Sequence, residues 1–309
     1  MIEVQDLRKE FGELVAVDGV SFTAAAGTIF GLLGPNGAGK STTIGCICGL
    51  LAPSGGRVRV LGHDVASDGV RARSDLGVVP QEVALYEDLS ARENLSFWGA
   101  AYGLRGGELA ARVDEVLELV GLLDRARDPV KKHSGGMKRR LNFGCGVVHR
   151  PRVLLLDEPT VGVDPQSRVR LLELVRQQAA GGASVLYTTH YMEEAQELCD
   201  RLAIIDHGKL IAQGSLDELR GMMGERDLLR LSGEFDPDTA RRALDGLDQV
   251  ELVSAEPDGL RLALSEASKK LSDVLAALAA AGCVVRETTL TRPSLESLFI
   301  KLTGRELRE

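Results

Sequence analysis

A glycine-rich segment followed by a lysine and a serine is the stretch of this sequence most able to do chemistry. It fits the pattern G-x-x-x-x-G-K-[ST] and directly follows the apolar run 29–33. Glycines let a backbone wrap closely around a phosphate, and the N–H groups at the start of a following helix favour negative charge. We therefore expect phosphate contacts from this loop and the residue after it: Gly34, Pro35, Asn36, Gly37, Ala38, Gly39, Lys40, Ser41 and Thr42.

Two side chains at the end of this loop have separate predicted tasks. Lys40 would reach the β- and γ-phosphates of a nucleotide, and the hydroxyl of Ser41 would take a position on Mg²⁺. After them, apolar residues recur at Ile44, Ile47 and Leu51, a spacing that predicts a helix facing a core. Strand, loop and helix are thus all predicted in the right order, and the expected cofactors are ATP and Mg²⁺.

An acidic pair follows another apolar run, residues 153–156. Asp157 and Glu158 would lie at the carboxyl edge of a parallel sheet, where open α/β folds bind their ligands. Asp157 is the expected Mg²⁺ partner, and Glu158, pointing the other way, would orient or deprotonate the attacking water. The alternative is a strand whose acidic end merely meets solvent, and the nearby phosphate loop favours the catalytic interpretation.

The elements that must position these residues follow from hydrophobic patterning. The first 25 residues alternate apolar and polar side chains, which predicts half-buried antiparallel strands. The continuous apolar runs 29–33, 153–156 and 184–188 are typical of strands buried on both faces of a parallel sheet. Helical segments are predicted between them, at 109–120 and 168–178. This alternation predicts an α/β domain.

The remainder of the chain predicts a second, smaller domain. A predicted short helix at 215–223 precedes a polar hinge, so we place one domain at 1–224 and the other at 225–309. The sequence pattern of the second domain predicts the order β-α-β-β-α-β of a ferredoxin-like α+β fold. Its expected elements are the strands 228–231, 250–255, 260–265 and 284–290, the helices 238–244 and 268–281, and a last short helix at 293–302.

A third motif, residues 133–137, opens a predicted helix and resembles the LSGGQ signature of ABC ATPases, which in that family completes the site of the opposite subunit. The resemblance covers residues 1 to about 220 and implies a P-loop ATPase domain with an antiparallel β-subdomain and a helical subdomain. It implies nucleotide contacts from Phe11 under the adenine, from Ser134, Gly135 and Gly136 of the signature, and from Asp164 of the D-loop. It also implies catalytic roles for Gln81 of the Q-loop, which would meet Mg²⁺ too, and for the switch residue His190.

The sequence departs from the family pattern, and some landmarks have alternatives. His133 replaces the usual Leu of the signature, Met137 replaces the usual Gln, and the D-loop has the sequence VGVD in place of SGLD. Phe11 has the alternative of a β-subdomain core residue, and His190 that of an ordinary surface or core histidine. The basic residues 131–132 and 138–140 predict a solvated helix face, with attraction of nucleotide or a partner as the alternative.

Composition limits the classes of function. A net charge of −8 and a pI near 5.3 argue against nucleic acid as a main partner. No apolar stretch reaches the roughly 20 residues that cross a bilayer, and no secretory signal is visible, so we expect a cytoplasmic protein. Five cysteines without CxxC spacing predict buried free thiols in place of a zinc site.

Residues 291–305 resemble the ending of daunorubicin-resistance-type ATP-binding subunits, which generally export drugs, lipids or polysaccharides. This resemblance implies two partners, an integral membrane permease and a second copy of this chain in a head-to-tail homodimer. The protein would then lie on the inner face of the cell membrane through the permease. Residues 83–98 are the expected docking surface, with burial of their aromatic residues in the subdomain core as the alternative. Two other functions are a soluble ABC ATPase acting on ribosomes or DNA, and a nucleotide-sensing module that does not hydrolyse ATP.

Overall fold

The computed structural model describes residues 1–222, 227–264, 267–291, 295, 298 and 299 of the chain. The described residues divide into two compact units after Leu216, and each unit is treated by itself. The domain boundary predicted between Gly224 and Glu225 lies outside the described residues and stays a prediction.

A six-stranded sheet forms the centre of the first unit, with strand order β10-β9-β3-β8-β7-β6. Strands β9, β3, β8, β7 and β6 are parallel to their neighbours, and β10 is antiparallel at one edge. Their bounds are β3 Ile29–Leu33, β6 Leu76–Val79, β7 Val153–Asp157, β8 Ser184–Thr189, β9 Arg201–Asp206 and β10 Lys209–Gly214. The three buried strands expected from the apolar runs are β3, β7 and β8.

The side chains of β7 show why these runs are apolar throughout. Leu154 and Leu156 pack into a core shared with the helices on one side of the sheet. Val153 and Leu155 pack into a second core on the other side. Since successive residues of a strand point to opposite faces, a sheet covered on both faces needs apolar residues at every position.

An antiparallel sheet and two short helices supply the second core. The sheet has the order β2-β1-β4-β5, and these elements are β1 Ile2–Phe11, β2 Leu14–Ala24, β4 Gly55–Val60, β5 His63–Asp64, α1 Lys40–Ile47 and α2 Gly69–Ser74. Its inward residues include Val4 and Val20, whose strand neighbours are exposed or half-buried. The predicted antiparallel β-subdomain is therefore present.

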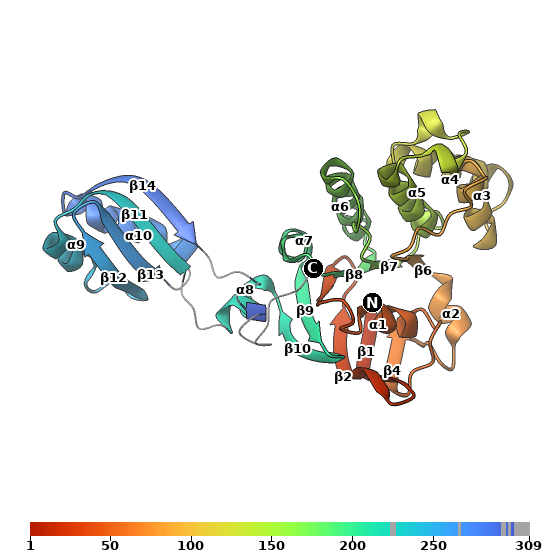
Figure 1. Ribbon diagram of the computed structural model, residues 1–309, viewed down its shortest axis with the longest axis horizontal. Coiled ribbons are helices and arrows are strands. Elements are labelled where there is room, and N and C mark those ends of the chain that lie inside the picture. The colour runs from red at the N-terminus through yellow and green to blue at the C-terminus, as the bar shows by residue number, and fades with distance from the viewer. Residues whose placement is uncertain (223–226, 265–266, 292–294, 296–297, 300–309) are drawn as a thin grey trace. The chain divides into compact units, whose positions relative to one another are not determined.

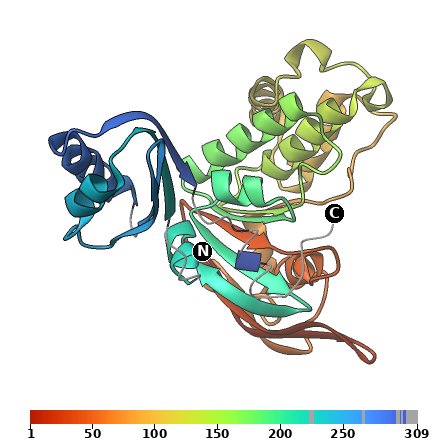
Figure 2. The ribbon, with the colours of Figure 1, turned by 60° about the vertical axis from the view of Figure 1, so that its left-hand side comes forward.

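Helices gather on the opposite side of the central sheet, as both ribbon views show (Figures 1 and 2). The start of α3 is fixed by a capping box, in which Ser90 and Glu93 each accept from the other's backbone N–H. Besides α1 and α2, the described helices of this unit are α3 Ala91–Ala101, α4 Gly106–Leu119, η1 Leu123–Arg125, η2 Val130–Lys132, α5 Gly135–Val147, α6 Pro165–Ala180, α7 Met192–Leu198 and, across the boundary, α8 Leu216–Gly221. No helix among the described residues is long and apolar enough to cross a membrane.

The second unit has the element order expected from its sequence. Its antiparallel sheet runs β12-β13-β11-β14, and two helices contribute to a core with one face of that sheet. The elements are β11 Asp227–Glu234, α9 Pro237–Leu244, β12 Val250–Glu256, β13 Gly259–Leu264, α10 Ala267–Ala280 and β14 Val284–Thr291. The ferredoxin-like assignment stays a prediction, and most of the helix predicted at 293–302 lies outside the described residues.

Strand order in the first unit brings the predicted chemistry to one edge. Strand β8 lies between β3 and β7, and all three run in the same direction. The phosphate loop follows β3, the acidic pair ends β7, and His190 follows β8. Three segments that are far apart in the chain therefore meet at the carboxyl ends of neighbouring strands.

Candidate active site

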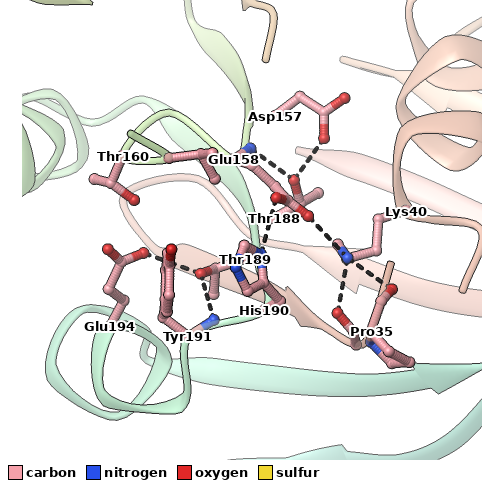
Figure 3. Close-up of polar contacts among 12 residues, drawn as sticks. Pro35, Lys40, Asp157, Glu158, Thr160, Thr188, Thr189, His190, Tyr191 and Glu194 are labelled. Atoms are coloured by element: carbon pink, nitrogen blue, oxygen red, sulfur yellow. Dashed lines mark hydrogen bonds and ion pairs between the residues drawn. The ribbon is translucent and has the colours of Figure 1, made fainter. Parts of the chain in front are cut away.

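The ammonium group of Lys40 lies at the centre of this edge, and only 4% of the residue is exposed. Its Nζ donates to the carbonyl oxygens of Gly34, at 2.7 Å, and Pro35, at 2.9 Å. The same Nζ lies 2.8 Å from Oε1 of Glu158 (Figure 3). The loop thus holds its lysine with its own backbone, and the charge faces a carboxylate from β7.

Glu158 connects the lysine to the histidine that follows β8. Its other carboxylate oxygen, Oε2, lies 2.9 Å from Nδ1 of His190. The carboxylate is 4% exposed and is held between the ammonium of Lys40, at the start of α1, and the imidazole of His190, directly after β8 (Figure 3). A buried carboxylate with this surrounding can accept a proton from a water at the same edge.

Asp157 takes a different partner, and the backbone explains why. Its Oδ1 accepts from the hydroxyl of Thr188 at 2.7 Å, because Thr188 is the residue opposite it on β8. Strand β7 ends at Asp157, and Glu158 has a left-handed φ of 43°. The two carboxylates therefore separate through this turn, and not through the simple strand alternation expected from the sequence.

A second buried acid, Glu194 of α7, belongs to a separate network. It accepts from the hydroxyls of Tyr187 and Thr189 and pairs with Nε of Arg168 at 2.7 Å. Figure 3 shows the hydrogen bond from Thr189 to this carboxylate, which lies apart from Lys40. It fixes the end of β8 against α7.

The phosphate loop needs glycine for both conformation and space at one position. Gly39, directly before α1, has a φ of 104°, which side chains other than glycine rarely adopt. A Cβ there would lie 2.5 Å from the carbonyl oxygen of Ala16. The tight backbone that brings Lys40 to Glu158 therefore requires this glycine.

The predicted signature lies at the start of α5. Ser134 caps that helix by accepting from the N–H of Met137 at 3.3 Å, and the residue is exposed. Gly136 is buried against α6, where a Cβ would lie 2.2 Å from Oγ of Ser167. Asp164, the last residue of the D-loop, caps α6 through Ser167, and this backbone hydrogen bond lowers the pKa of its carboxyl. Signature and D-loop are therefore packed together within one chain.

Comparison with known proteins decides the family. The family described as ABC transporter matches residues 17–161. The linearmycin resistance ATP-binding protein LnrL of Bacillus subtilis is 43% identical over 100% of both chains. The daunorubicin resistance ATP-binding protein DrrA3 of Streptomyces coeruleorubidus is 38% identical over 99% of this chain and 97% of its own. The Nod factor export ATP-binding protein I of Sinorhizobium fredii is 38% identical over 100% of this chain and 87% of its own.

This chain belongs to the ABC transporter family. Solved structures agree: an ATP-binding subunit of an ABC transporter matches 72% of this chain and 93% of its own at 33% identity, with a TM-score of 0.67. A dimeric ATP-binding cassette with bound ADP and phosphate matches 70% of this chain and 99% of its own at 25% identity, with a TM-score of 0.64. The protein is accordingly an ATP-binding subunit and an ATPase. The resemblance noted in the sequence is confirmed, and the alternative of a soluble ABC ATPase for ribosomes or DNA is not favoured.

Side-chain exposure settles some of the remaining sequence alternatives. Phe11 is 46% exposed with Lys9 over its ring, so its alternative as a core residue is wrong. Tyr86 and Phe97 are exposed and stack edge to face, whereas Trp98 packs against the helical core. The expected exposure of the aromatic residues in 83–98 is thus right for two and wrong for Trp98.

Two other expectations have different outcomes. The five cysteines are all free, but the expected burial is right only for Cys46, Cys48 and Cys145, because Cys199 and Cys283 are half-buried. No group of three or more metal-binding side chains occurs among the described residues. The basic face predicted around α5 is only partly solvated. Arg139 is buried, with 9% exposure, and its guanidinium bonds to two backbone carbonyls, so the prediction is wrong for this residue.

His133, the residue that replaces the usual Leu of the ABC ATPase signature, is also buried. Only 6% of the residue is exposed, and neither ring nitrogen makes a well-formed hydrogen bond to the residues that the structure describes. Burial lowers the pKa of its imidazole, and the carboxylate of Asp128 and the backbone of Arg125 oppose this shift with smaller effects. A buried polar ring without partners reduces stability compared with an apolar side chain of similar size.

Replacing His133 with Leu should therefore raise the free energy of unfolding by about 1 kcal/mol at neutral pH. The folded pKa is lower than the unfolded pKa, so the unfolded state binds more protons as the pH falls through about 6.5. The parent should lose stability there, and His133→Leu should lose less. Urea unfolding at pH 7.5 and 5.5 measures both. Equal pH dependence in the two proteins would contradict this account of the ring.

Proposed function

We propose that this subunit hydrolyses ATP at the edge formed by Lys40, Glu158 and His190. The observation that carries the proposal is the buried Glu158 carboxylate, held between Lys40 and His190 at the ends of neighbouring strands. Lys40 binds the β- and γ-phosphates. Glu158 orients the attacking water and takes its proton, and His190 holds the second oxygen of Glu158.

Mg²⁺ is the cation whose chemistry suits the remaining donors. Asp157 contributes a carboxylate oriented by Thr188, and Ser41 contributes a hydroxyl at the start of α1, both hard oxygen ligands. Gln81, after β6, is the third proposed contact. When bound, the ion would neutralise charge on the phosphate oxygens. Loop residues 34–42 would supply further phosphate contacts, and Phe11 would lie under the adenine.

A second copy of the chain is the proposed source of the remaining contacts. Ser134, Gly135 and Gly136 begin a 13-residue helix, and Ser134 is exposed. The polar contact of its hydroxyl within the described chain is to its own helix, at Met137. In the proposed head-to-tail dimer these groups, with Asp164, complete the nucleotide site of the other copy. The dimeric ADP-bound cassette supports this arrangement.

The dimer drives a separate integral membrane permease and lies on the cytoplasmic face of the membrane through it. The relatives named for linearmycin resistance, daunorubicin resistance and Nod factor export support transport out of the cell. The exposed pair Tyr86 and Phe97 is the proposed permease contact, because exposed aromatic clusters favour protein partners. We keep the division into a nucleotide-binding domain, 1–224, and an accessory domain, 225–309.

Dimerisation should depend on nucleotide. With ATP, the slow Glu158→Gln protein should elute as a dimer in gel filtration, and without ATP as a monomer. Adding Ser134→Arg should abolish the shift, because a bulky cation would replace the hydroxyl at the interface. Ser272→Arg, the same change on an exposed residue of α10, is the matched control and should leave the shift intact. A monomer under all conditions would favour the nucleotide-sensing module instead.

A further inference from the structure

Arg139 is a buried cation without an acidic partner. It lies in the second turn of α5, five residues after the signature serine. No carboxylate of the described residues lies within ion-pair distance of its guanidinium, and burial lowers the pKa of this group. Burying an unpaired charge is costly, so its retention calls for a reason other than simple packing.

The N–H groups of the guanidinium donate hydrogen bonds to two loops. One Nη donates to the backbone carbonyl of Gln81, in the loop after β6. The other Nη donates to the carbonyl of Val161 at 2.9 Å, in the loop after β7. Arginine suits this task because its rigid fork presents several N–H groups in different directions. One side chain therefore joins the signature helix to both loops.

The Val161 end of this connection is linked to Glu158. The N–H of Val161 donates to the carbonyl of Glu158 at 3.3 Å, which closes the turn after the acidic pair. The N–H of Glu158 is in turn held by the carbonyl and hydroxyl of Thr188. Arg139 therefore restrains Val161, at the end of the turn that begins with Glu158.

Asn142, one turn further along α5, is attached to only one of these loops. Its side chain accepts from the N–H of Ala84 at 3.1 Å and donates to the carbonyl of Pro80 at 3.4 Å. Both contacts belong to the loop after β6. Asn142 therefore supports that loop alone, whereas Arg139 joins it to the loop after β7.

We propose that Arg139 is a positioning residue that couples the signature helix and the Gln81 loop to the turn carrying Glu158. The inference rests on the proposed function, in which Gln81 and Glu158 serve the reaction. When α5 and the Gln81 loop move as nucleotide and the second copy bind, Arg139 carries that movement to the turn after Glu158. Its loss leaves the phosphate loop intact but uncouples the position of Glu158 from the signature.

The test compares Arg139→Met with Arg140→Met in the full chain. Arg140 is the matched control, because its Nη1 also donates to two backbone carbonyls, those of Val120 and Gly121. Both contacts lie at the end of α4, away from the nucleotide loops. Arg139→Met should lower kcat about tenfold or more and leave the Kd of a fluorescent ATP analogue within about twofold. Arg140→Met should change neither quantity by more than about twofold.

Two further variants keep the test decisive. Arg139→Lys retains the charge but not the forked guanidinium, so it should restore thermal stability more fully than kcat. If the Arg139→Met protein does not fold, Arg139→Lys takes its place in the comparison. Asn142→Leu removes only the contacts to the Gln81 loop and should lower kcat less than Arg139→Met.

Three results would overturn the proposal. These are equal kcat for the two arginine variants, full recovery of kcat in Arg139→Lys, and an Asn142→Leu effect as large as that of Arg139→Met. Glu158→Gln in the same assay separates this failure from that of the proposed site. If Glu158→Gln retains turnover, the site assignment is wrong. If Glu158→Gln loses turnover while Arg139→Met and Arg140→Met have equal kcat, the site assignment holds and only the proposed coupling through Arg139 is wrong.

Discussion

Replacing Glu158 with Gln should reduce ATP turnover by about 100-fold or more while ATP binding is kept. The amide fills the same space but cannot accept the proton of the attacking water. ATP affinity should equal or exceed that of the parent, because Glu158 competes with phosphate for Lys40 at 2.8 Å. Phosphate release at saturating ATP and equilibrium titration with a fluorescent ATP analogue measure the two effects.

Glu194→Gln is the control for this variant. Glu194 is a fully buried carboxylate near the same sheet edge, but its partners are Tyr187, Thr189 and Arg168. The change should reduce stability because it weakens a buried charged network, while turnover stays within a few-fold of the parent. Wild-type-like hydrolysis by Glu158→Gln, or an equal loss of turnover in both variants, would contradict the assignment of Glu158 as the group that takes the proton of the attacking water.

Replacing Lys40 with Ala should weaken ATP binding itself by about 100-fold or more. The change removes the buried cation that the loop directs toward the phosphates, and charge-assisted contacts to phosphate contribute about 1.5–3 kcal/mol each. Turnover is lost as well, because the same contact acts in the ground state and the transition state. Titration with the fluorescent analogue at fixed salt concentration measures the affinity.

Lys209→Ala is the matched control for this loss. Lys209 is an exposed lysine that pairs with Asp18 at 3.4 Å, on the edge strand β10. Removing it takes the same charge from the protein and should leave the affinity unchanged. Because Lys40→Ala also leaves Glu158 with only His190 beside it, thermal unfolding must show that the variant is folded. Unchanged ATP affinity in folded Lys40→Ala protein would contradict the phosphate-loop interpretation.

Local patterns predicted the parts of this protein that are determined locally. The runs 29–33, 153–156 and 184–188 became β3, β7 and β8, because strands buried on both faces need apolar residues throughout. The acidic pair and His190 followed these strands in the sequence, so their place at the carboxyl edge could be predicted as well. Short edge elements were missed: β6 has four residues, including Gly77, and carries too little pattern to stand out.

Contacts between distant segments could not be predicted. Arg139 lies in a run of basic residues that is typical of a solvated surface, and its burial depends on carbonyls 58 and 22 positions away. The turn at Glu158 could not be predicted either, because a left-handed φ at a residue other than glycine has no reliable sequence signal. The burial of His133 could not be predicted either, because histidine at this position is compatible with an exposed or a buried side chain.

A single-turnover experiment tests the central claim most directly. Parent and Glu158→Gln proteins are loaded with radiolabelled ATP and Mg²⁺, freed of excess nucleotide, incubated and quenched, and the bound nucleotide is separated as ATP or ADP. We predict that the parent converts its bound ATP to ADP, and that Glu158→Gln retains intact ATP over the same period. Conversion to ADP at the parent rate by Glu158→Gln would contradict the account, and so would failure of both proteins to hold nucleotide.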